Sequence, residues 1–224
     1  IGIHEKGVSA LESLLFAKYQ MYRNVYWHHA VRSATCMFKR AVRAAVRDGV
    51  LSHQEVADAT DDGLTERLST VDRTGLARAV PARRLYKRPL DLPASEVPEE
   101  TESWARAQPD LLERVEDQLA TELGLRPGEL LFDFPTNPSM LAVDLPLRTR
   151  TGEVERLTGE GVAGQFGLPR VADALYRSAR RLRIFTASPV SRDLTDAREL
   201  VALSPRELVV RLGHRALLPS RPPP

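Results

Sequence analysis

The segment KYQMYRNVYWHHAVR, residues 18–32, decides how the first part of the chain is organised. It lies in a run from Gly7 to Gly49 whose interior contains no glycine or proline and is rich in Ala, Leu, Arg and Val at helical spacing. Ser9 and Glu12 have the spacing of a capping box, and Gly49 is a typical helix stop. We therefore expect a long central helix here, or two helices joined by a kink.

Breakers and caps divide the rest of the chain. Further helices are expected at 52–59, 64–68, 75–80, 103–123 and 170–181. Ser52 and Glu55 form a second capping-box pattern, and Asp61-Asp62-Gly63 reads as a break. The helix at 103–123 is expected to be interrupted near Pro109 and to end at Gly124.

Strand patterns follow in the second half of the chain. They fall at 130–134, 140–147, 154–157 and 182–186, and Pro146 favours an edge position for the second of them. The expected fold is mainly α with a smaller α+β C-terminal portion. We expect four segments: a helical part at 1–90, a linker and helix at 91–123, a small α+β lobe at 124–190, and an extension with a Pro-rich, disordered tail at 191–224.

Composition narrows the class of protein. The 224 residues are 28% charged but carry a net charge of only +2, so bulk charge favours neither a nucleic-acid nor a membrane partner. No apolar run approaches the ~20 residues of a membrane span. The single cysteine, Cys36, fits a small buried residue in a reducing, cytoplasmic protein. Because the chain opens at Ile1 within a patterned segment, we expect it to be part of a longer protein.

Motifs of catalytic and metal sites are missing from the sequence. It contains no phosphate loop, no G-x-G-x-x-G, no H-E-x-x-H and no His-Asp dipeptide. The five histidines do not fall into metal-ligand spacing. We therefore assign no catalytic residue and no metal ligand.

One helical face combines charge with hydroxyl groups. Lys18, Tyr22, Tyr26 and His29 recur at helical spacing, and an ammonium with phenols suits an anionic, hydroxyl-bearing ligand. A neighbouring stripe is mostly apolar; it consists of Leu14, Met21, Val25 and His28, with Arg32 one turn beyond. The alternative is structural: tyrosines at the edge of a core with solvated hydroxyls, and His28 as a core histidine.

Two segments, residues 5–12 and 17–32, resemble the region just downstream of the metal core in HD-superfamily phosphohydrolases of the dNTP-triphosphohydrolase type. The family pattern is roughly E-K-G-x-x-A-[IL]-E, followed by A-R-Y-x-M-Y-x-x-V-Y-x-H-K. Lys18 stands where the family usually has Arg, and His29 where it has Lys. Lysine lacks the bidentate guanidinium of arginine, and His29 is largely neutral at pH 7. Both changes therefore weaken the expected binding of a triphosphate.

The resemblance implies two sets of binding residues. The first, Lys18, Tyr22 and Tyr26, would face the substrate nucleotide. The second would belong to a regulatory nucleotide site at a subunit interface. It comprises His28 and His29 together with Arg83, Leu85 and Lys87 of the extended segment RRLYK. The alternative for the RRLYK segment is a solvated basic stretch.

By the same resemblance, hydrolysis in the full-length parent would use a divalent metal held by His, a His-Asp pair and a distant Asp. None of these ligands is found in this sequence, so we expect the chain alone to be inactive. The implied partners are a nucleotide substrate or effector and further copies of the chain. A second hypothesis is a non-catalytic nucleotide-sensing or oligomerisation module. A third, nucleic-acid binding, would rest on basic clusters at Lys39, Arg40, Arg43 and Arg47 and at Arg180, Arg181 and Arg183.

Overall fold

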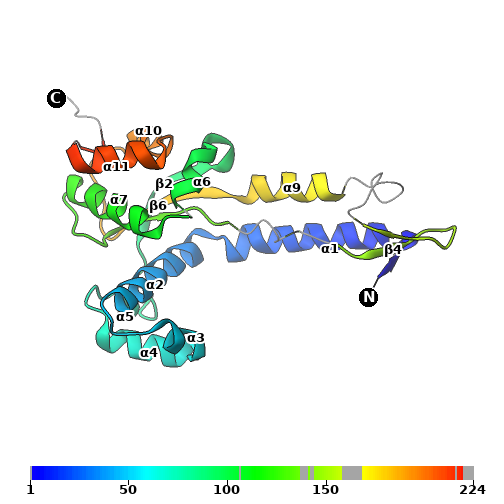
Figure 1. The fold of residues 1–224 in the computed structure, drawn as a ribbon, viewed down its shortest axis with the longest axis horizontal. Helices are drawn as coiled ribbons and strands as arrows, with labels where there is room; N and C mark the ends of the chain where they lie inside the picture. Colours follow the sequence, from blue (N-terminus) through cyan, green and yellow to red (C-terminus); the bar gives the residue numbers. More distant parts are fainter. Residues whose placement is uncertain are drawn as a thin grey trace. The chain divides into compact units, whose positions relative to one another are not determined.

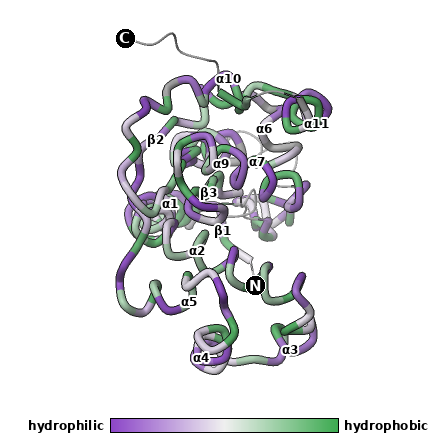
Figure 2. Tube along the Cα trace, turned by 90° about the vertical axis from the view of Figure 1, so that its left-hand side faces the viewer, coloured by the Kyte–Doolittle hydropathy of each residue, from purple (hydrophilic) through white to green (hydrophobic). Residues whose placement is uncertain are grey.

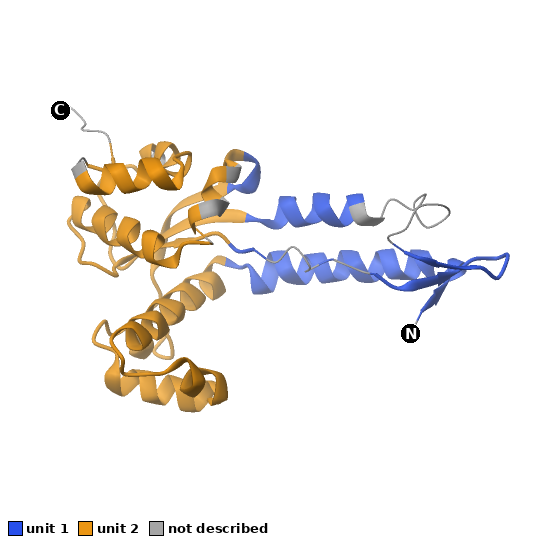
Figure 3. Cartoon of the chain, in the orientation of Figure 1, with its two compact units in different colours: residues 1–28, 93–95, 135–180 blue, residues 29–92, 96–134, 181–224 orange. Residues whose placement is uncertain are grey.

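The computed structural model describes residues 2–105, 107–136, 141, 144–157, 168–214 and 216–218 (Figure 1). The chain forms two compact units (Figure 3). Unit 1 contains residues 1–28, 93–95 and 135–180, and unit 2 contains residues 29–92, 96–134 and 181–224. Each unit thus gathers segments that are distant in sequence. The four consecutive segments expected above stay a prediction.

Unit 1 begins with a short strand, β1 (Ile3–His4), and a 3-10 turn, Glu5–Gly7, which lead into α1 (Val8–Met21). The predicted Ser9–Glu12 capping box is wrong, because the residue before the helix is Gly7, which has no side-chain acceptor. The side chain of His4 instead accepts a hydrogen bond from the Lys6 amide and starts the 3-10 turn. The helix is therefore already under way at Ser9.

A π-helical turn, Tyr22–Tyr26, follows α1 directly. The Trp27 amide donates to the Tyr22 carbonyl at 2.7 Å, five residues back, which widens the last turn. A new helix, α2 (His29–Arg47), then starts. The second of the two predicted arrangements, two helices rather than one, is the one observed. The predicted stop is confirmed, since Gly49 follows α2 with a left-handed φ of 70°.

The helices of unit 1 pack through two small apolar clusters. α1 contacts α9 (Leu168–Ala179). Buried residues of one cluster are Tyr19, Trp27, Leu141 and Ala179, and those of the other are Val8, Leu11, Leu15, Leu147 and Leu157. The second cluster joins α1 to a three-stranded sheet.

That sheet has the order β1-β4-β5, with β4 (Pro146–Arg148) at its centre and β5 (Val154–Arg156) antiparallel to it. The predicted edge position of Pro146 is therefore wrong. Proline is tolerated because it is the first residue of β4, where a missing N–H breaks no ladder bond. Residues 140, 142 and 143 of the predicted strand lie outside the described residues, as does the predicted tail at 220–224.

Unit 2 continues with α3 (His53–Asp58), α4 (Asp61–Val71) and α5 (Leu76–Ala79). The capping box of Ser52 and Glu55 is confirmed. The predicted break at Asp61 is wrong, because the Thr60 hydroxyl accepts a hydrogen bond from the amide of Gly63 and caps α4. Acidic residues in this first turn also suit the positive end of a helix.

The sheet of unit 2 has the order β2-β6-β3, made of β2 (Lys87–Pro93), β6 (Arg181–Thr186) and β3 (Leu130–Asp133). Successive side chains of a strand point to opposite faces. One face supplies Leu92, Leu130, Phe132, Leu182 and Ile184 to a core shared with the C-terminal helices. On the other face, Leu131 packs into the cluster that contains α2.

Four helices complete that larger core: α6 (Glu99–Ala105), α7 (Pro109–Glu122), α10 (Ala197–Val201) and α11 (Pro205–His214). Hydrophobic and hydrophilic residues interleave along α7 and α11 in Figure 2, as expected for helices with one buried face. The predicted interruption near Pro109 is confirmed. So is the fold class: in the residues that the structure describes, the protein is mainly helical, with two small three-stranded sheets.

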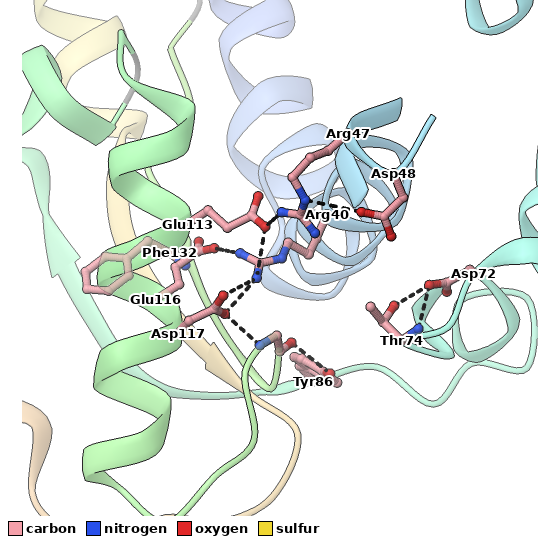
Figure 4. Close-up of polar contacts among 11 residues, drawn as sticks. Arg40, Arg47, Asp48, Asp72, Thr74, Tyr86, Glu113, Glu116, Asp117 and Phe132 are labelled. Carbon is pink, nitrogen blue, oxygen red and sulfur yellow. Dashed lines mark hydrogen bonds and ion pairs between the residues drawn. The ribbon is translucent and has the colours of Figure 1, made fainter. Parts of the chain in front are cut away.

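A buried ion-pair network joins α2 to α7 (Figure 4). Arg40, only 6% exposed, lies 3.0 Å from Glu116, 2.6 Å from Asp117 and 3.3 Å from Glu113. Glu113 also pairs with Arg47, and Glu116 accepts the Phe132 amide at 2.8 Å. The network therefore also reaches β3.

Burial raises the pKa of Glu116 from 4.5 to about 8, although the Phe132 amide and the charge of Arg40 oppose the shift. A raised folded-state pKa stabilises the protein below about pH 4.5, and this contribution is lost as the pH rises through about 8. We expect the free energy of unfolding to fall more steeply over this range in the wild type than in Glu116→Gln. Urea unfolding at several pH values measures the difference, and parallel curves would contradict it.

Candidate functional site

The predicted substrate-binding residues lie at the end of α1 and in the π-helical turn, all in unit 1. Lys18 is exposed in the last turn of α1, Tyr22 is half-buried, and Tyr26 is 52% exposed. The rings of Tyr22 and Tyr26 are 5.1 Å apart. Single π-turns inside helices are frequent at functional sites, because they re-aim side chains at a cost in regularity.

The neighbouring residues support this turn from the core side. Trp27 is buried and lies 5.6 Å from the Tyr22 ring in an edge-on arrangement. The hydroxyl of buried Tyr19, which the sequence patterns did not single out, accepts hydrogen bonds from Arg23 and Ser178, each at 3.3 Å. Tyr22 therefore serves partly as a core-edge residue, whereas Tyr26 presents most of its ring to solvent.

The predicted regulatory residues other than His28 belong to unit 2. His29 is the exposed first residue of α2. One turn later, buried Ser33 donates a hydrogen bond to the Tyr86 carbonyl at 2.9 Å. The Tyr86 amide also lies 3.5 Å from the sulfur of Met37. These contacts hold Tyr86 of the RRLYK segment against the first turns of α2.

The three RRLYK residues differ in environment. Arg83 is exposed and has a left-handed φ of 54°, because it closes the turn that follows α5. The segment was expected to be extended throughout, and this expectation is wrong at Arg83. Leu85 is half-buried against the apolar cluster of α2, and Lys87 is the exposed first residue of β2. A polar ligand could therefore reach Arg83 and Lys87 more readily than Leu85.

The first turn of α2 combines a helix N-terminus with an arginine that is paired with a carboxylate. Residues 29–32 contain no acidic side chain, and the N-terminal amides of a helix attract anions. Arg32 makes a bidentate pair with Asp133 of β3, with contacts of 2.6, 3.0 and 3.1 Å. Burial is the largest single influence and lowers the pKa of Arg32, but the hydrogen bonds and the negative charge of Asp133 together raise that pKa above its ordinary value.

Cys36 lies beside the same carboxylate. Its Sγ is 3.4 Å from Asp133 Oδ1, and the thiol is half-buried. Burial raises the pKa of Cys36 well above its ordinary value, and the negative charge of Asp133 acts in the same direction. This thiol therefore acts as a weak donor in the packing of α2 on β3.

The basic clusters considered for nucleic-acid binding are not intact surfaces. Arg40 and Arg183 are 6% and 4% exposed and are engaged by carboxylates inside unit 2. Among the described residues, no three or more His, Cys, Asp and Glu side chains are grouped so that they could hold a metal ion. The helices of that same part of the chain include none that is long and apolar enough to cross a membrane.

Comparisons with known proteins found a family model, a partial sequence match and a distant structural match. Residues 1–160 match the model of the HD associated region. An uncharacterized protein of Methanocaldococcus jannaschii, MJ1154, is 40% identical over 87 residues, which are 39% of this chain and 19% of that protein. The crystal structure of the phosphohydrolase BT4208 from Bacteroides thetaiotaomicron gives a TM-score of 0.41 with 14% identity, over 82% of this chain and 50% of that one. The chain thus spans a fifth of one relative and half of the other.

Proposed function

The chain belongs to the family of HD-associated regions, and from that premise we propose that it is the nucleotide-binding portion of a metal-dependent HD-domain phosphohydrolase. Lys18, Tyr22 and Tyr26 bind the substrate nucleotide. His28, His29, Arg83, Leu85 and Lys87 bind a regulatory nucleotide. The divalent metal and the groups that activate water belong to a part of the protein beyond these 224 residues, so the chain alone is inactive.

The observation that carries the proposal is the docking of the RRLYK segment on α2. Ser33, Tyr86 and Met37 hold two sequence-distant segments together within one unit. His29 precedes Ser33 by one helical turn, Lys87 directly follows Tyr86 in the chain, and both are exposed. A phosphate placed there would meet the positive end of α2 and the ammonium of Lys87.

The substrate-binding half of the proposal rests on chemistry at the π-helical turn. An exposed ammonium pairs with a phosphate oxygen, and an exposed phenol donates a hydrogen bond while its ring packs on a sugar or base. A cytoplasmic, homo-oligomeric protein would follow from the same family resemblance.

The alternative function is a non-catalytic nucleotide-sensing or oligomerisation module. It is favoured by exposed apolar side chains at helical spacing in α1 and the π-helical turn, namely Leu14, Met21 and Val25. Such a row of apolar side chains is typical of a surface that another protein covers. Turnover of a nucleotide that depends on Lys18 would decide for the phosphohydrolase.

We expect Lys18→Ala in the full-length protein to lower kcat/KM for deoxynucleoside triphosphates about tenfold to a hundredfold, the range for losing a charge-assisted hydrogen bond. Tyr26→Phe should cost less, because the ring remains. Steady-state kinetics and metal analysis of each variant are the measurements. Lys39→Ala, which removes an exposed lysine of α2, is the matched control. Wild-type kinetics for both Lys18→Ala and Tyr26→Phe would refute the substrate-binding role. So would loss of metal together with activity in either variant.

A further inference from the structure

One face of the β2-β6-β3 sheet is charged where it meets the start of α2. Asp91 lies on β2, Arg181 and Arg183 on β6, and Asp133 on β3. Asp133 is directly opposite Arg183 in the strand register. The alternate residues of β6 point into the apolar core on the other face of the sheet. Charged side chains on this face therefore lie together across three strands.

Asp91 is shared by three arginines. Arg88 pairs with Oδ2, Arg181 Nε lies 2.5 Å from Oδ1, and Arg183 Nε lies 3.7 Å from the same Oδ1. The second carboxylate, Asp133, already holds Arg32, and Arg183 Nη1 approaches it only to 3.6 Å. Four arginines thus surround two aspartates, so four positive and two negative charges leave an excess of two positive charges.

Arg183 lacks hydrogen bonds at two of its donors. The residue is 4% exposed, and in the part of the chain that the structure describes its Nε and Nη1 have no hydrogen-bond acceptor. Burial lowers its pKa, and the neighbouring charges of Arg88 and Arg181 add to that effect against Asp91 and Asp133. A buried donor without an acceptor costs free energy, and natural proteins keep few of them.

The other two arginines are accessible. The side chains of Arg88 and Arg181 are 34% and 38% exposed, so an anion can approach them from solvent while Arg183 stays covered. Arg88 also directly follows Lys87, a residue of the regulatory site proposed above. This juxtaposition places a partly solvated pair of guanidinium groups next to a buried one that needs an acceptor.

We propose that Arg88 and Arg181 bind a phosphate group in exchange for Asp91, which then turns to Arg183. The phosphate oxygens replace the Asp91 carboxylate on the two exposed guanidinium groups, where bidentate contacts are possible. Asp91 Oδ1 now lies 3.7 Å from the unsatisfied Nε of Arg183, so a shift of less than about 1 Å brings it within hydrogen-bond distance. The Nε of Arg183 then has an acceptor, and the excess positive charge is reduced by the ligand.

The ligand class is a phosphate-bearing anion. Its assignment to the polyphosphate of a regulatory nucleotide rests on the proposed function; binding of the anion does not. Two aspartates in the cluster would repel an anion, so the exchange predicts that a mutation in the binding cluster raises the affinity for the anion. Removing the carboxylate of Asp91 should strengthen binding, because it competes for the same two guanidinium groups. A purely structural network predicts no such gain.

The test uses inorganic pyrophosphate as the probe and the 224-residue chain, with binding followed by isothermal titration calorimetry. Arg88→Gln and Arg181→Gln should each weaken binding about fivefold or more, and Asp91→Asn should tighten it about threefold. Arg126→Gln, which removes an exposed arginine paired with Glu129 in the same unit, should leave binding unchanged. Thermal melting reports whether each variant is folded. Because Arg88→Gln alters a partly exposed side chain, we expect this variant to fold.

Wild-type affinity in folded Arg88→Gln or Arg181→Gln would overturn the inference, as would weaker binding in Asp91→Asn or no pyrophosphate binding by the wild type. If His29→Ala and Lys87→Ala weaken pyrophosphate binding while Arg88→Gln does not, the regulatory site stands and the exchange at Asp91 falls. The substrate role of Lys18 is judged separately by the kinetics of the full-length protein.

Discussion

Replacing Arg40 by methionine should lower the free energy of unfolding by about 3 kcal/mol or more, the usual cost of removing one partner from a buried ion pair. Arg40 is the cation between Glu113, Glu116 and Asp117, and its side chain is 7% exposed. Without it, Glu113 and Asp117, one turn apart on α7, repel each other where α7 meets α2, and Glu116 loses a donor. Urea unfolding followed by circular dichroism is the measurement.

Two variants make this result interpretable. Arg67→Met removes an arginine whose pair with Glu55 is largely exposed, and it should leave the free energy of unfolding nearly unchanged. Adding Glu116→Met to Arg40→Met should restore part of the loss, because an apolar pair suits a buried position. A loss for Arg40→Met no larger than that for Arg67→Met would show that the network contributes little.

Local signals in the sequence predicted much of the helical structure. The capping box at Ser52, the stop at Gly49 and the interruption near Pro109 each act within one or two helical turns, so they are readable without the fold. The strands at 130–133 and 181–186 were recognisable as short apolar runs bounded by breakers.

The errors in the predicted fold arise where a contact between residues distant in sequence, or one without a local sequence signal, determines the structure. β1 pairs with β4 across more than 140 residues, and that pairing puts Pro146 in the central strand. The π-helical turn at 22–26 contains no glycine or proline, so no breaker announces it. Thr60 caps α4 three residues before Gly63, which converts an apparent Asp-Asp-Gly break into a first helical turn.

The candidate site was predictable in part. Helical spacing and the family pattern together singled out Lys18, Tyr22 and Tyr26, but no local pattern joins Asp91 to β6. One signal was available: Arg183 and Asp133 are opposite charges, each placed inside a short apolar strand. Charges in buried strands are usually paired. Their direct register in the sheet bears this out, but only the pairing of the strands reveals that Arg32 joins them.

Replacing Asp133 by alanine should cost about 3–5 kcal/mol in the free energy of unfolding, because it leaves the half-buried Arg32 and the buried Arg183 without a shared carboxylate. Asp133 is 2% exposed, bonds Arg32 at 2.6 Å and lies 3.6 Å from Arg183. Its loss also removes the polar tie between the start of α2 and β3. Urea unfolding measures the effect on stability. Hydrogen exchange of the early amides of α2 measures the local effect.

Arg32→Lys is the discriminating companion to that experiment. It keeps the positive charge but loses the bidentate fork, so it should destabilise less than Asp133→Ala. Suppose that hydrogen exchange at the start of α2 is faster in both variants, and that both bind pyrophosphate more weakly than their loss of stability explains. Asp133 would then position the His29 end of the helix for binding the anion. If Asp133→Ala destabilises the protein while exchange near His29 and pyrophosphate binding stay at wild-type values, the carboxylate acts on packing alone. The first turn of α2 would then be held by the Ser33–Tyr86 contact.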